Sequence, residues 1–269
     1  MSNVLITVEN VSKTFSSGGI FKKQKENRVL EDICLEIRKN ETLALVGESG
    51  CGKTTLGRII LGLEKPDTGR ILYEGKEISD GIRADREVRK NMQMVFQDSF
   101  ASLDPKMRVE DILLEPMLAS GMCRRKKEGL ETVRELLETV GLKEEHMKRY
   151  PHQFSGGQRQ RIGIARALAV QPSFIVCDEP VSALDVSVQA QILNLLKEIK
   201  KKRNLSLLFI SHDLGVVRYI ADRVVIMNQG KICETGTTEE VYNSPTDSYT
   251  KYLLQAVPRM RKQASESGQ

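Results

Sequence analysis

A single glycine-rich segment constrains the fold of this chain more than any other. Residues 47–54, GESGCGKT, match the pattern GxxxxGK[S/T], with an apolar stretch at 43–46 before them and a predicted helix at 54–63 after them. A strand, such a loop and a helix in this order form a cradle whose backbone N–H groups and positive helix end face a phosphate group. A glycine-rich turn without function is the alternative, but it leaves the flanking strand and helix unexplained.

Each residue of the segment has a physical role in such a cradle. The glycines let the backbone wrap around an anion. Lys53 is placed to reach the outer phosphates, and the Thr54 hydroxyl is placed to ligate Mg²⁺. The residues predicted to contact the nucleotide here are Gly47, Glu48, Ser49, Gly50, Cys51, Gly52, Lys53, Thr54 and Thr55.

The rest of the pattern is that of an α/β protein with a helical insertion. Apolar stretches at 5–8, 29–37 and 42–46 make the first third β-rich, and the polar segment 16–28 is predicted to be a surface loop. Helical patterns dominate residues 99–170. Further on, strands at 174–177 and 205–210 alternate with a helix at 187–202, which favours a parallel sheet. Residues 223–228 and 231–234 flank an Asn-Gln-Gly turn and predict a hairpin.

Two acidic residues stand where a metal ion and a water molecule could be held. Asp178 and Glu179 follow the apolar stretch 174–177, so Asp178 is predicted to lie at the sheet edge where the glycine-rich loop opens. Its carboxylate suits the Mg²⁺ shell, and Glu179, which points another way, suits a general base. A helix N-cap followed by a first-turn acid would be the simpler interpretation of the pair alone. The glycine-rich loop favours the catalytic one, because an enzyme with that loop needs such a strand.

A second anion site is predicted about a hundred residues beyond Lys53. Residues 155–158, SGGQ, precede a strongly helical stretch, and Ser155 is placed to cap it. A capped helix start offers free N–H groups and a hydroxyl to an anion. One chain has little use for two phosphate sites on one nucleotide. Two chains placed head to tail could each complete the other's site.

Composition excludes several classes of protein. The 269 residues, 40% hydrophobic and 29% charged, are those of an ordinary globular protein, and no signal segment is expected, because the first residues lack a basic and then apolar pattern. No apolar run approaches the roughly 20 residues that cross a bilayer. The five cysteines form no CxxC pair, so reduced cytosolic thiols are expected rather than disulfides or zinc. The net charge of +5 is dispersed and indicates a solvated surface, and no nucleic-acid partner is expected.

These motifs, in this order, resemble those of the ATP-binding-cassette (ABC) ATPases over residues 5–258. The resemblance implies an α/β fold with a RecA-like P-loop NTPase core, an antiparallel β subdomain and an inserted helical subdomain. It implies one ABC ATPase domain over 1–258, with the helical subdomain at about 99–170, and a tail at 259–269 that is expected to be disordered. The implied cofactors are ATP and Mg²⁺.

The resemblance also assigns roles to single residues. It implies that Phe15 stacks on adenine, that Gln97 lies in the Mg²⁺ and water shell at the hinge to the helical subdomain, and that His212 contacts the γ-phosphate. The implied catalytic residues are Lys53, Gln97, Glu179 and His212, and the implied Mg²⁺ ligands are Thr54, Gln97 and Asp178. The residues implied to meet the partner chain or its ATP are Ser155, Gly156, Gly157, Gln158 and Asp185. Phe154 departs from the usual Leu, although an apolar residue there can still pack beneath the cap.

Several stretches are similar to one branch of that family, the bacterial importers of peptides and nickel. These stretches are residues 94–98, 102–105, 150–155 and 248–254. The polar segment 16–28 suits that group's second ATPase subunit, whereas residues 246–248, TDS, depart from a frequent His-Pro. The implied function is to energise a multi-subunit importer, preferentially of dipeptides or oligopeptides, with nickel as the alternative cargo.

The implied partners are a second, similar ATPase subunit, in a heterodimer or a homodimer, and two membrane-spanning permease subunits. An extracytoplasmic substrate-binding protein takes part indirectly, and the chain is placed peripherally at the cytoplasmic face of the membrane. A soluble cassette that acts on ribosomes or DNA is the alternative of another class, but it would carry two cassettes or a long coiled-coil insertion. A P-loop kinase would have no use for SGGQ. Finally, Cys51 lies near Lys53 and a helix start, which favour the thiolate, so alkylation is expected to block ATP binding.

Overall fold

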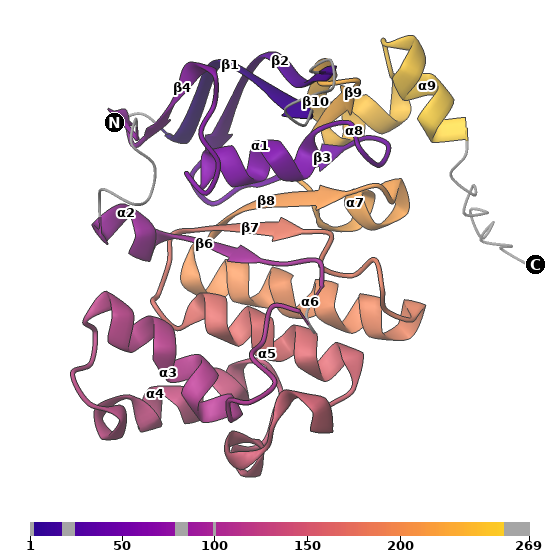
Figure 1. Cartoon of the computed structure of the whole chain (residues 1–269). Coiled ribbons are helices and arrows are strands. Elements are labelled where there is room, and N and C mark those ends of the chain that lie inside the picture. The colour runs from indigo at the N-terminus through magenta and orange to yellow at the C-terminus, as the bar shows by residue number, and fades with distance from the viewer. Residues whose placement is uncertain (1–2, 18–24, 79–85, 99–100, 256–269) are drawn as a thin grey trace, which may run out of the picture.

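The computed structural model describes residues 3–17, 25–78, 86–98 and 101–255 (Figure 1). A six-stranded sheet forms its centre, with the strand order β10-β9-β3-β8-β7-β6. Neighbouring strands are parallel, except that β10 runs antiparallel to β9. The strands are β3 (Thr42–Val46), β6 (Met92–Val95), β7 (Phe174–Asp178), β8 (Ser206–Ser211), β9 (Arg223–Asn228) and β10 (Lys231–Thr237). The parallel sheet and the hairpin expected at 223–234 are confirmed.

The central strands are apolar along their whole length because both faces of the sheet are covered. Every residue of β3, β7 and β8 is buried. Helix α1 (Lys53–Ile60) covers one face and inserts Leu56, Ile59 and Ile60 between the two sheets of the molecule. Helices α5 (Gly156–Leu168), α6 (Val186–Arg203) and α7 (Leu214–Ile220) cover the other face.

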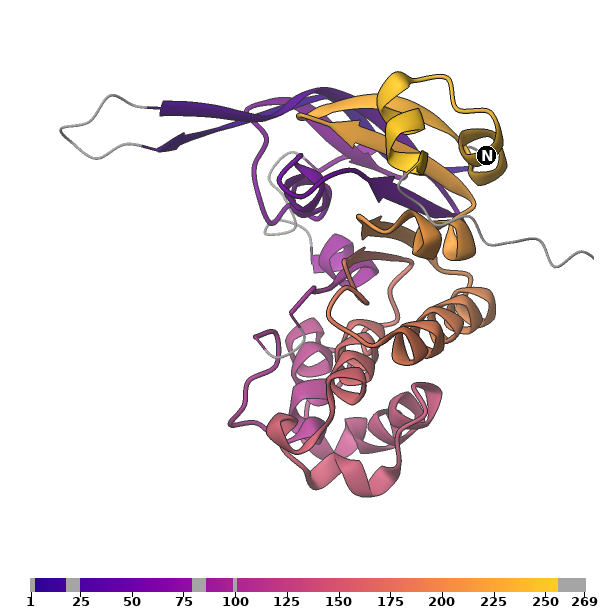
Figure 2. The same cartoon turned by 90° about the vertical axis from the view of Figure 1, so that its right-hand side faces the viewer.

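A second, antiparallel sheet lies above α1 in Figure 1 and has the order β2-β1-β4-β5. Its strands are β1 (Val4–Ser17), β2 (Lys25–Arg38), β4 (Thr68–Tyr73) and β5 (Lys76–Glu77). Strands β1 and β2 continue past the end of β4 as a projecting hairpin arm (Figure 2). The loop predicted at 16–28 is therefore wrong at its ends, because Ser16 pairs with Glu26 and Ser17 with Lys25. A projecting arm has no buried face, so its sequence lacks the alternation that indicates a strand.

Helices fill most of the stretch between β6 and β7. These are α3 (Val109–Ser120), α4 (Lys126–Thr139), the short 3₁₀ helices η1 (Glu144–Lys148) and η2 (Pro151–Gln153), and α5. They form a layer below the central sheet in Figure 1, with α3 packed on both α4 and α5. Helix α2 (Arg86–Asn91), which sequence analysis did not predict, leads into β6. The tail at 259–269 lies outside the described residues.

Two short helices follow β10 and end the described chain. Helix α8 (Thr238–Asn243) packs on β9 and β10, and helix α9 (Ser248–Gln255) packs on β10. Within the described ranges, the structure contains no helix that combines the length and the apolar character needed to span a membrane.

The parallel strands β3, β6, β7 and β8 all end at the same edge of the central sheet. The segments that leave this edge are 47–52, 96–98, 179–185 and 212–213. Residues that are far apart in the sequence, from the glycine-rich loop to His212, are thereby brought to one place. This is the edge at which open α/β sheets bind their ligands.

Candidate functional site

A cavity of about 650 Å³ lies at this edge of the sheet. The glycine-rich loop and the start of α1 form its floor, and side chains from the ends of three other strand segments surround it. The residues that line it are Val29, Val46, Gly47, Glu48, Ser49, Gly50, Gly52, Lys53, Thr54, Thr55, Gln97, Glu179, His212 and Leu253. The structure thus brings together the predicted phosphate contacts, except Cys51, and three of the predicted catalytic side chains from elsewhere in the chain.

The backbone of the loop needs glycine at two positions for different reasons. A Cβ atom on Gly47 would lie 2.2 Å from the Met227 carbonyl oxygen of β9, which is backbone and cannot rotate away. Gly52 has a φ of 107° and caps α1, and a Cβ atom there would lie 2.6 Å from the Val29 carbonyl oxygen. The loop therefore lies so close to β2 and β9 that only glycine fits at these two positions.

Lys53 is buried, with 4% of its surface exposed, yet its ammonium group is fully engaged by the loop. Its Nζ atom donates to the carbonyl oxygens of Gly47 and Glu48, at 2.7 Å in each case. A buried ammonium group requires such partners, because an unpaired charge in the interior is very costly. The loop therefore carries a concentrated positive charge that an anion can exploit.

Thr54 and Asp178 place two oxygen atoms next to this charge. The Thr54 hydroxyl donates to Asp178 Oδ1 at 2.9 Å. Burial raises the pKa of the Asp178 carboxyl, while the bond from Thr54 acts in the opposite direction. Hydroxyl and carboxylate oxygens are the hard ligands that Mg²⁺ prefers. Gln97, the third predicted ligand, lines the same cavity but its amide faces Glu179.

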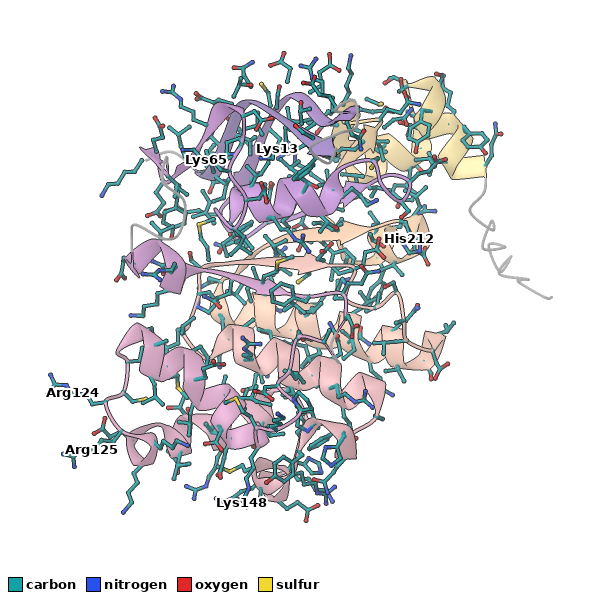
Figure 3. All side chains as sticks on the ribbon, in the orientation of Figure 1. Lys13, Lys65, Arg124, Arg125, Lys148 and His212 are labelled. Atoms are coloured by element: carbon teal, nitrogen blue, oxygen red, sulfur yellow. The ribbon has the colours of Figure 1, made fainter. Side chains whose placement is uncertain are left out.

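Glu179 is held by two side chains from different strand ends. Gln97 Nε2 donates to Glu179 Oε2 at 3.1 Å, and His212 Nδ1 lies 3.2 Å from the same oxygen. Glu179 is 14% exposed, whereas His212 is 55% exposed and lies at the rim, at the side of the molecule where β8 ends (Figure 3). This cluster of a carboxylate, an amide and an imidazole can orient a water molecule and move a proton.

The backbone of Glu179 is strained in a way that fixes its direction. Its φ of 43° lies in the left-handed region, which costs a non-glycine residue free energy. The Glu179 N–H donates to the Ile210 carbonyl of β8 at 3.0 Å, which continues the sheet bonding by one residue. The left-handed turn directly after β7 sends Asp178 and Glu179 in different directions, as the sequence predicted for this pair. Strain of this kind is typical of functional sites.

The SGGQ segment lies at the start of α5, outside this cavity. Ser155 Oγ accepts from the Gln158 N–H at 3.3 Å, and Gln158 Oε1 accepts from the Ser155 N–H at 3.0 Å, so the predicted cap is confirmed. Gly157 lets α5 approach α6 closely, because a Cβ atom there would lie 2.4 Å from Val188 Cγ1. Gly156 faces solvent. None of these four residues lines the cavity described above.

Asp185 and its neighbour mark a second exposed segment. Asp185 is exposed at the N-terminus of α6, and Val186 beside it is 81% exposed, the highest value among the large apolar residues that the structure describes. Ser182 Oγ, in the same loop, donates to the Glu179 carbonyl at 3.1 Å. The loop at 182–185 is thus tied directly to the residue that lines the cavity.

One predicted feature, the Cys51 thiolate, differs from the structure, and the stacking of Phe15 on adenine stays a prediction. Phe15 is 41% exposed, and the Lys13 ammonium group lies 5.2 Å from the centroid of its ring. Phe15 is not among the residues that line the cavity, whereas Val29 of the paired strand is. Cys51 is 7% exposed, and burial raises the pKa of its thiol despite the nearby Lys53 ammonium group. The expected stabilisation of its thiolate was wrong, because desolvation outweighs the attraction of the lysine. Phe154, by contrast, is buried and packs edge-on against His146, as expected.

Sequence analysis missed the contribution of the C-terminal helix to the cavity. Leu253 of α9 is among the lining residues, and Tyr249 Oη accepts from the Glu48 N–H at 3.3 Å. The stretch 248–254 was recognised as typical of one branch of a family, but nothing in it indicated where it would lie. Only the fold reveals this contact, which joins residues 201 positions apart.

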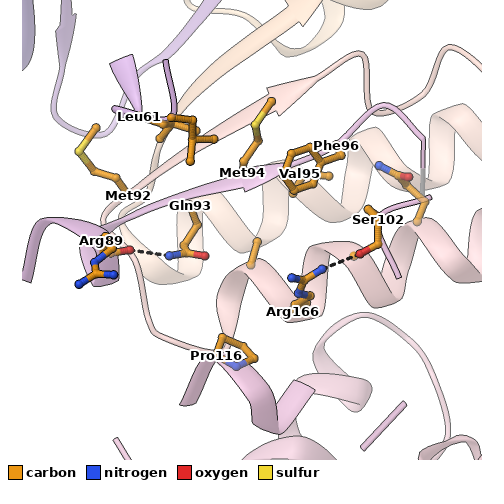
Figure 4. Close-up of a pocket in the computed structure, with 14 residues that line it drawn as sticks. Leu61, Arg89, Met92, Gln93, Met94, Val95, Phe96, Ser102, Pro116 and Arg166 are labelled. Carbon is orange, nitrogen blue, oxygen red and sulfur yellow. Dashed lines mark hydrogen bonds between the residues drawn. The ribbon is translucent and has the colours of Figure 1, made fainter. Parts of the chain in front are cut away.

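A second cavity, of about 260 Å³, lies between the central sheet and the helical layer (Figure 4). Its wall is formed mainly by β6 and by one face of α5, with Leu61 and Leu63 at one side. Two exposed apolar side chains, Leu63 and Phe96, border it. Arg166 is held in place by donating to the Ser102 carbonyl at 2.6 Å, and Gln160 Nε2, buried in the wall, has no hydrogen-bond partner among the described residues.

Comparisons with known proteins agree with this geometry. A family model described as "ABC transporter" matches residues 30–182. The chain is 51% identical over 257 residues to the dipeptide transport ATP-binding protein DppF of Lactococcus lactis, which covers 94% of this chain and 81% of that protein. It is 52% identical over 233 residues to the oligopeptide transport ATP-binding protein OppF of Bacillus subtilis, covering 86% of this chain and 76% of that protein.

Two solved structures have the same fold. The cbiO1 protein of Clostridium perfringens, part of the ABC transporter complex cbiONQ, superposes with a TM-score of 0.77 at 28% identity over 90% of this chain and 92% of that one. The ATP-binding cassette MJ0796, solved as a dimer bound to ADP and Pi, gives a TM-score of 0.76 at 27% identity over 87% of this chain and 99% of that one.

Proposed function

Because the chain belongs to the ABC transporter family, we propose that it is the ATP-hydrolysing subunit of a membrane importer of dipeptides or oligopeptides. One observation supports this most directly. The glycine-rich loop, Thr54 and the Gln97–Glu179–His212 cluster all border a single cavity at the C-terminal edge of a parallel sheet, and the Thr54 hydroxyl donates to the buried Asp178 behind it. The names of the relatives support peptides as the cargo.

In the proposed reaction, the loop binds the phosphates of ATP. The Lys53 ammonium group, which donates to two loop carbonyls, would exchange one of them for a phosphate oxygen. Glu179 accepts a proton from the attacking water, while Gln97 and His212 hold its carboxylate in place. These residues act mainly by position and electrostatics, as is usual for phosphoryl transfer.

The Thr54 hydroxyl and the Asp178 carboxylate would hold Mg²⁺. They fit this role because both are oxygen donors, 2.9 Å apart, beside the loop. When bound, Mg²⁺ neutralises charge that develops on the phosphate oxygens. The raised pKa of Asp178 fits the same role, because a buried carboxylate whose charge is poorly compensated gains from a cation.

A second, similar chain would complete the site. Ser155 to Gln158 present a capped helix start to solvent, away from this chain's own cavity. We place them on the ATP of a partner cassette, with Asp185 and the exposed Val186 in the seam between the two chains. The dimeric arrangement of the related MJ0796 cassette supports this pairing.

The cavity between the sheet and the helical layer would receive a helix of a membrane-spanning permease subunit. Its exposed apolar rim, Leu63 and Phe96, and the unpaired Gln160 amide offer both apolar and polar contacts to a helix. Phe96 is adjacent to Gln97, so a helix in this cavity would respond to changes at the ATP site. We propose that residues 99–170 form a helical subdomain that moves about this point. The chain would then lie at the cytoplasmic face of the membrane.

Replacing Glu179 with Gln tests the assignment of the general base. The variant keeps the shape and the bonding capacity of the side chain but cannot accept a proton, so ATP binding should persist while turnover falls by about 10²-fold or more. Binding is measured by titration and turnover by phosphate release, with Glu135→Gln on the exposed face of α4 as the matched control. Undiminished hydrolysis in Glu179→Gln would remove this residue from the mechanism.

The cargo requires a separate measurement. Uptake of labelled dipeptides, oligopeptides and nickel is compared in a strain that lacks this chain and in the same strain with the chain restored. Loss of peptide uptake alone supports the proposal. Loss of nickel uptake alone would assign the same ATPase to a metal importer.

A further inference from the structure

Helix α9 lies against the glycine-rich loop, although nothing in the mechanism above uses it. Its Tyr249 side chain accepts a hydrogen bond from the Glu48 N–H at 3.3 Å. Leu253, one helical turn further on, lines the same cavity as the loop. Residues four positions apart lie on one face of a helix, so α9 presents a single face, with a polar and an apolar contact, to the site.

This face is held in place by a network of hydrogen bonds at the start of α9. The Asp247 carboxylate accepts from the N–H groups of Tyr249 at 2.8 Å and Thr250 at 3.2 Å. Glu234 of β10 accepts from the Thr246 N–H at 2.8 Å, from its hydroxyl at 2.9 Å and from the Asp247 N–H at 3.2 Å. The helix is therefore anchored to the central sheet rather than resting loosely on the surface.

The end of the glycine-rich loop is bonded to the β9–β10 hairpin, the hairpin that also holds the start of α9. The N–H of Gly230, in the turn between β9 and β10, donates to the Cys51 carbonyl at 3.2 Å. The loop is thus bonded near its start by Tyr249 and near its end by Gly230. Both contacts come from the C-terminal part of the chain, so this part fixes the shape of the cradle from outside.

We propose that α9 is part of the nucleotide site, with Tyr249 as a positioning residue for the start of the cradle and Leu253 in contact with the adenosine part of the nucleotide. The inference rests on the proposed function, since it requires that the cavity binds ATP. Phosphates need hydrogen-bond donors, which the loop amides and Lys53 supply. Leu253 offers none, and an aliphatic side chain against a phosphate would only remove water from the charge. It suits the base and ribose instead.

The test measures the dissociation constant for ATP and the turnover at saturating ATP in the full chain. Tyr249→Phe removes the acceptor of one hydrogen bond and should weaken ATP binding about threefold to tenfold. Leu253→Ala removes three carbon atoms from a partly buried contact and should weaken it roughly fivefold, whereas Leu253→Met should restore most of the affinity. Turnover at saturating ATP and the unfolding midpoint are measured for all three variants, so that a loss of ATP affinity is distinguished from a loss of catalysis or of folding.

The matched control is Tyr252→Phe, because Tyr252 lies on the same helix, is 63% exposed and does not line the cavity. Unchanged ATP affinity in both Tyr249→Phe and Leu253→Ala would overturn the inference, and so would equal weakening in Tyr252→Phe. A change in turnover without a change in affinity would also overturn it. If the parent chain itself failed to bind ATP, the proposed function would fail first, so the two failures are distinguishable.

Discussion

The close approach of α5 to α6 leads to a quantitative prediction about two adjacent glycines. Gly156 and Gly157 both lie in the first turn of α5, and neither has a positive φ. A Cβ atom on Gly156 would lie 3.5 Å from Leu184 Cδ2, which is an ordinary contact. A Cβ atom on Gly157 would lie 2.4 Å from Val188 Cγ1. Chemically identical changes at the two positions should therefore differ in their effect on stability, and only the change at Gly157 should be destabilising.

The magnitudes follow from these distances. Carbon atoms make their best contact at about 3.5 Å or more, so alanine at 157 overlaps Val188 by about 1 Å. Val188 is β-branched and stiff within a helix, so relief requires an unfavourable rotamer or a shift of α5. Overpacking of this kind costs about 1–3 kcal/mol, against a gain of at most about 1 kcal/mol from replacing glycine in a helix. We expect Gly157→Ala to lower the free energy of unfolding by about 1–2 kcal/mol, and Gly156→Ala to leave it unchanged or raise it slightly.

Urea unfolding monitored by circular dichroism measures both variants under one set of conditions. Val188→Ala removes the obstructing atom, so Gly157→Ala in that background should cost much less than in the parent, which a double-mutant cycle quantifies. Equal stability of Gly156→Ala and Gly157→Ala would refute the reasoning. So would an unchanged cost of Gly157→Ala in the Val188→Ala background, because the damage would then have another cause.

Two further predictions concern buried groups next to the cavity, Cys51 and Asp178. Burial raises the pKa of Cys51, so alkylation of Cys51 should be slower than alkylation of the exposed Cys34, and its rate should keep rising as the pH rises beyond ~9. Bound ATP should slow the alkylation of Cys51 further. Mass spectrometry of the labelled peptides measures both rates. Burial likewise raises the pKa of Asp178 above its unfolded value, so the folded state binds more protons between the two values, and the free energy of unfolding falls as the pH rises through that window. Asp178→Asn should remove this slope and be more stable than the parent at ~pH 7 without nucleotide, as measured by urea unfolding from ~pH 4 upward.

Each of these predictions has an outcome that contradicts it. Faster alkylation at Cys51 than at Cys34 would mean that the Lys53 charge outweighs burial. A parent chain whose stability rises across the window, or an Asp178→Asn variant less stable than the parent at ~pH 7, would mean that the folded state favours the carboxylate rather than the acid.

Sequence analysis was sufficient to predict those parts of the site that are formed by consecutive residues. The glycine-rich loop could be recognised because its glycines, Lys53 and Thr54 are consecutive, and β7 because Asp178 ends an uninterrupted apolar run. The meeting of Gln97, Glu179 and His212 could be expected only through a family resemblance, since it depends on three strands ending at one edge. The cap at Ser155 followed from its own four residues and was found as expected.

What sequence could not predict depends on contacts between distant segments. The bond between Glu48 and Tyr249 joins residues 201 positions apart and leaves no periodic or compositional trace. The pKa of Cys51 was misjudged because sequence shows the neighbouring lysine but not the degree of burial. The β1–β2 arm was read as a loop because strands that project into solvent do not alternate polar and apolar side chains. In each case the missing quantity was the environment of a residue and not its identity.

The left-handed backbone of Glu179 has a consequence for attempts to make this protein more heat-resistant. The conformation costs a residue with a side chain about 1–2 kcal/mol relative to glycine, and asparagine tolerates it better than glutamate does. A laboratory selection that rewards survival at high temperature and ignores uptake would therefore favour Gly or Asn at this position. The variants enriched by such a selection would be more stable but would lack Glu179, the proposed general base. Any such selection on this chain should keep Glu179 unchanged, because otherwise thermal stability would rise while ATP hydrolysis is lost.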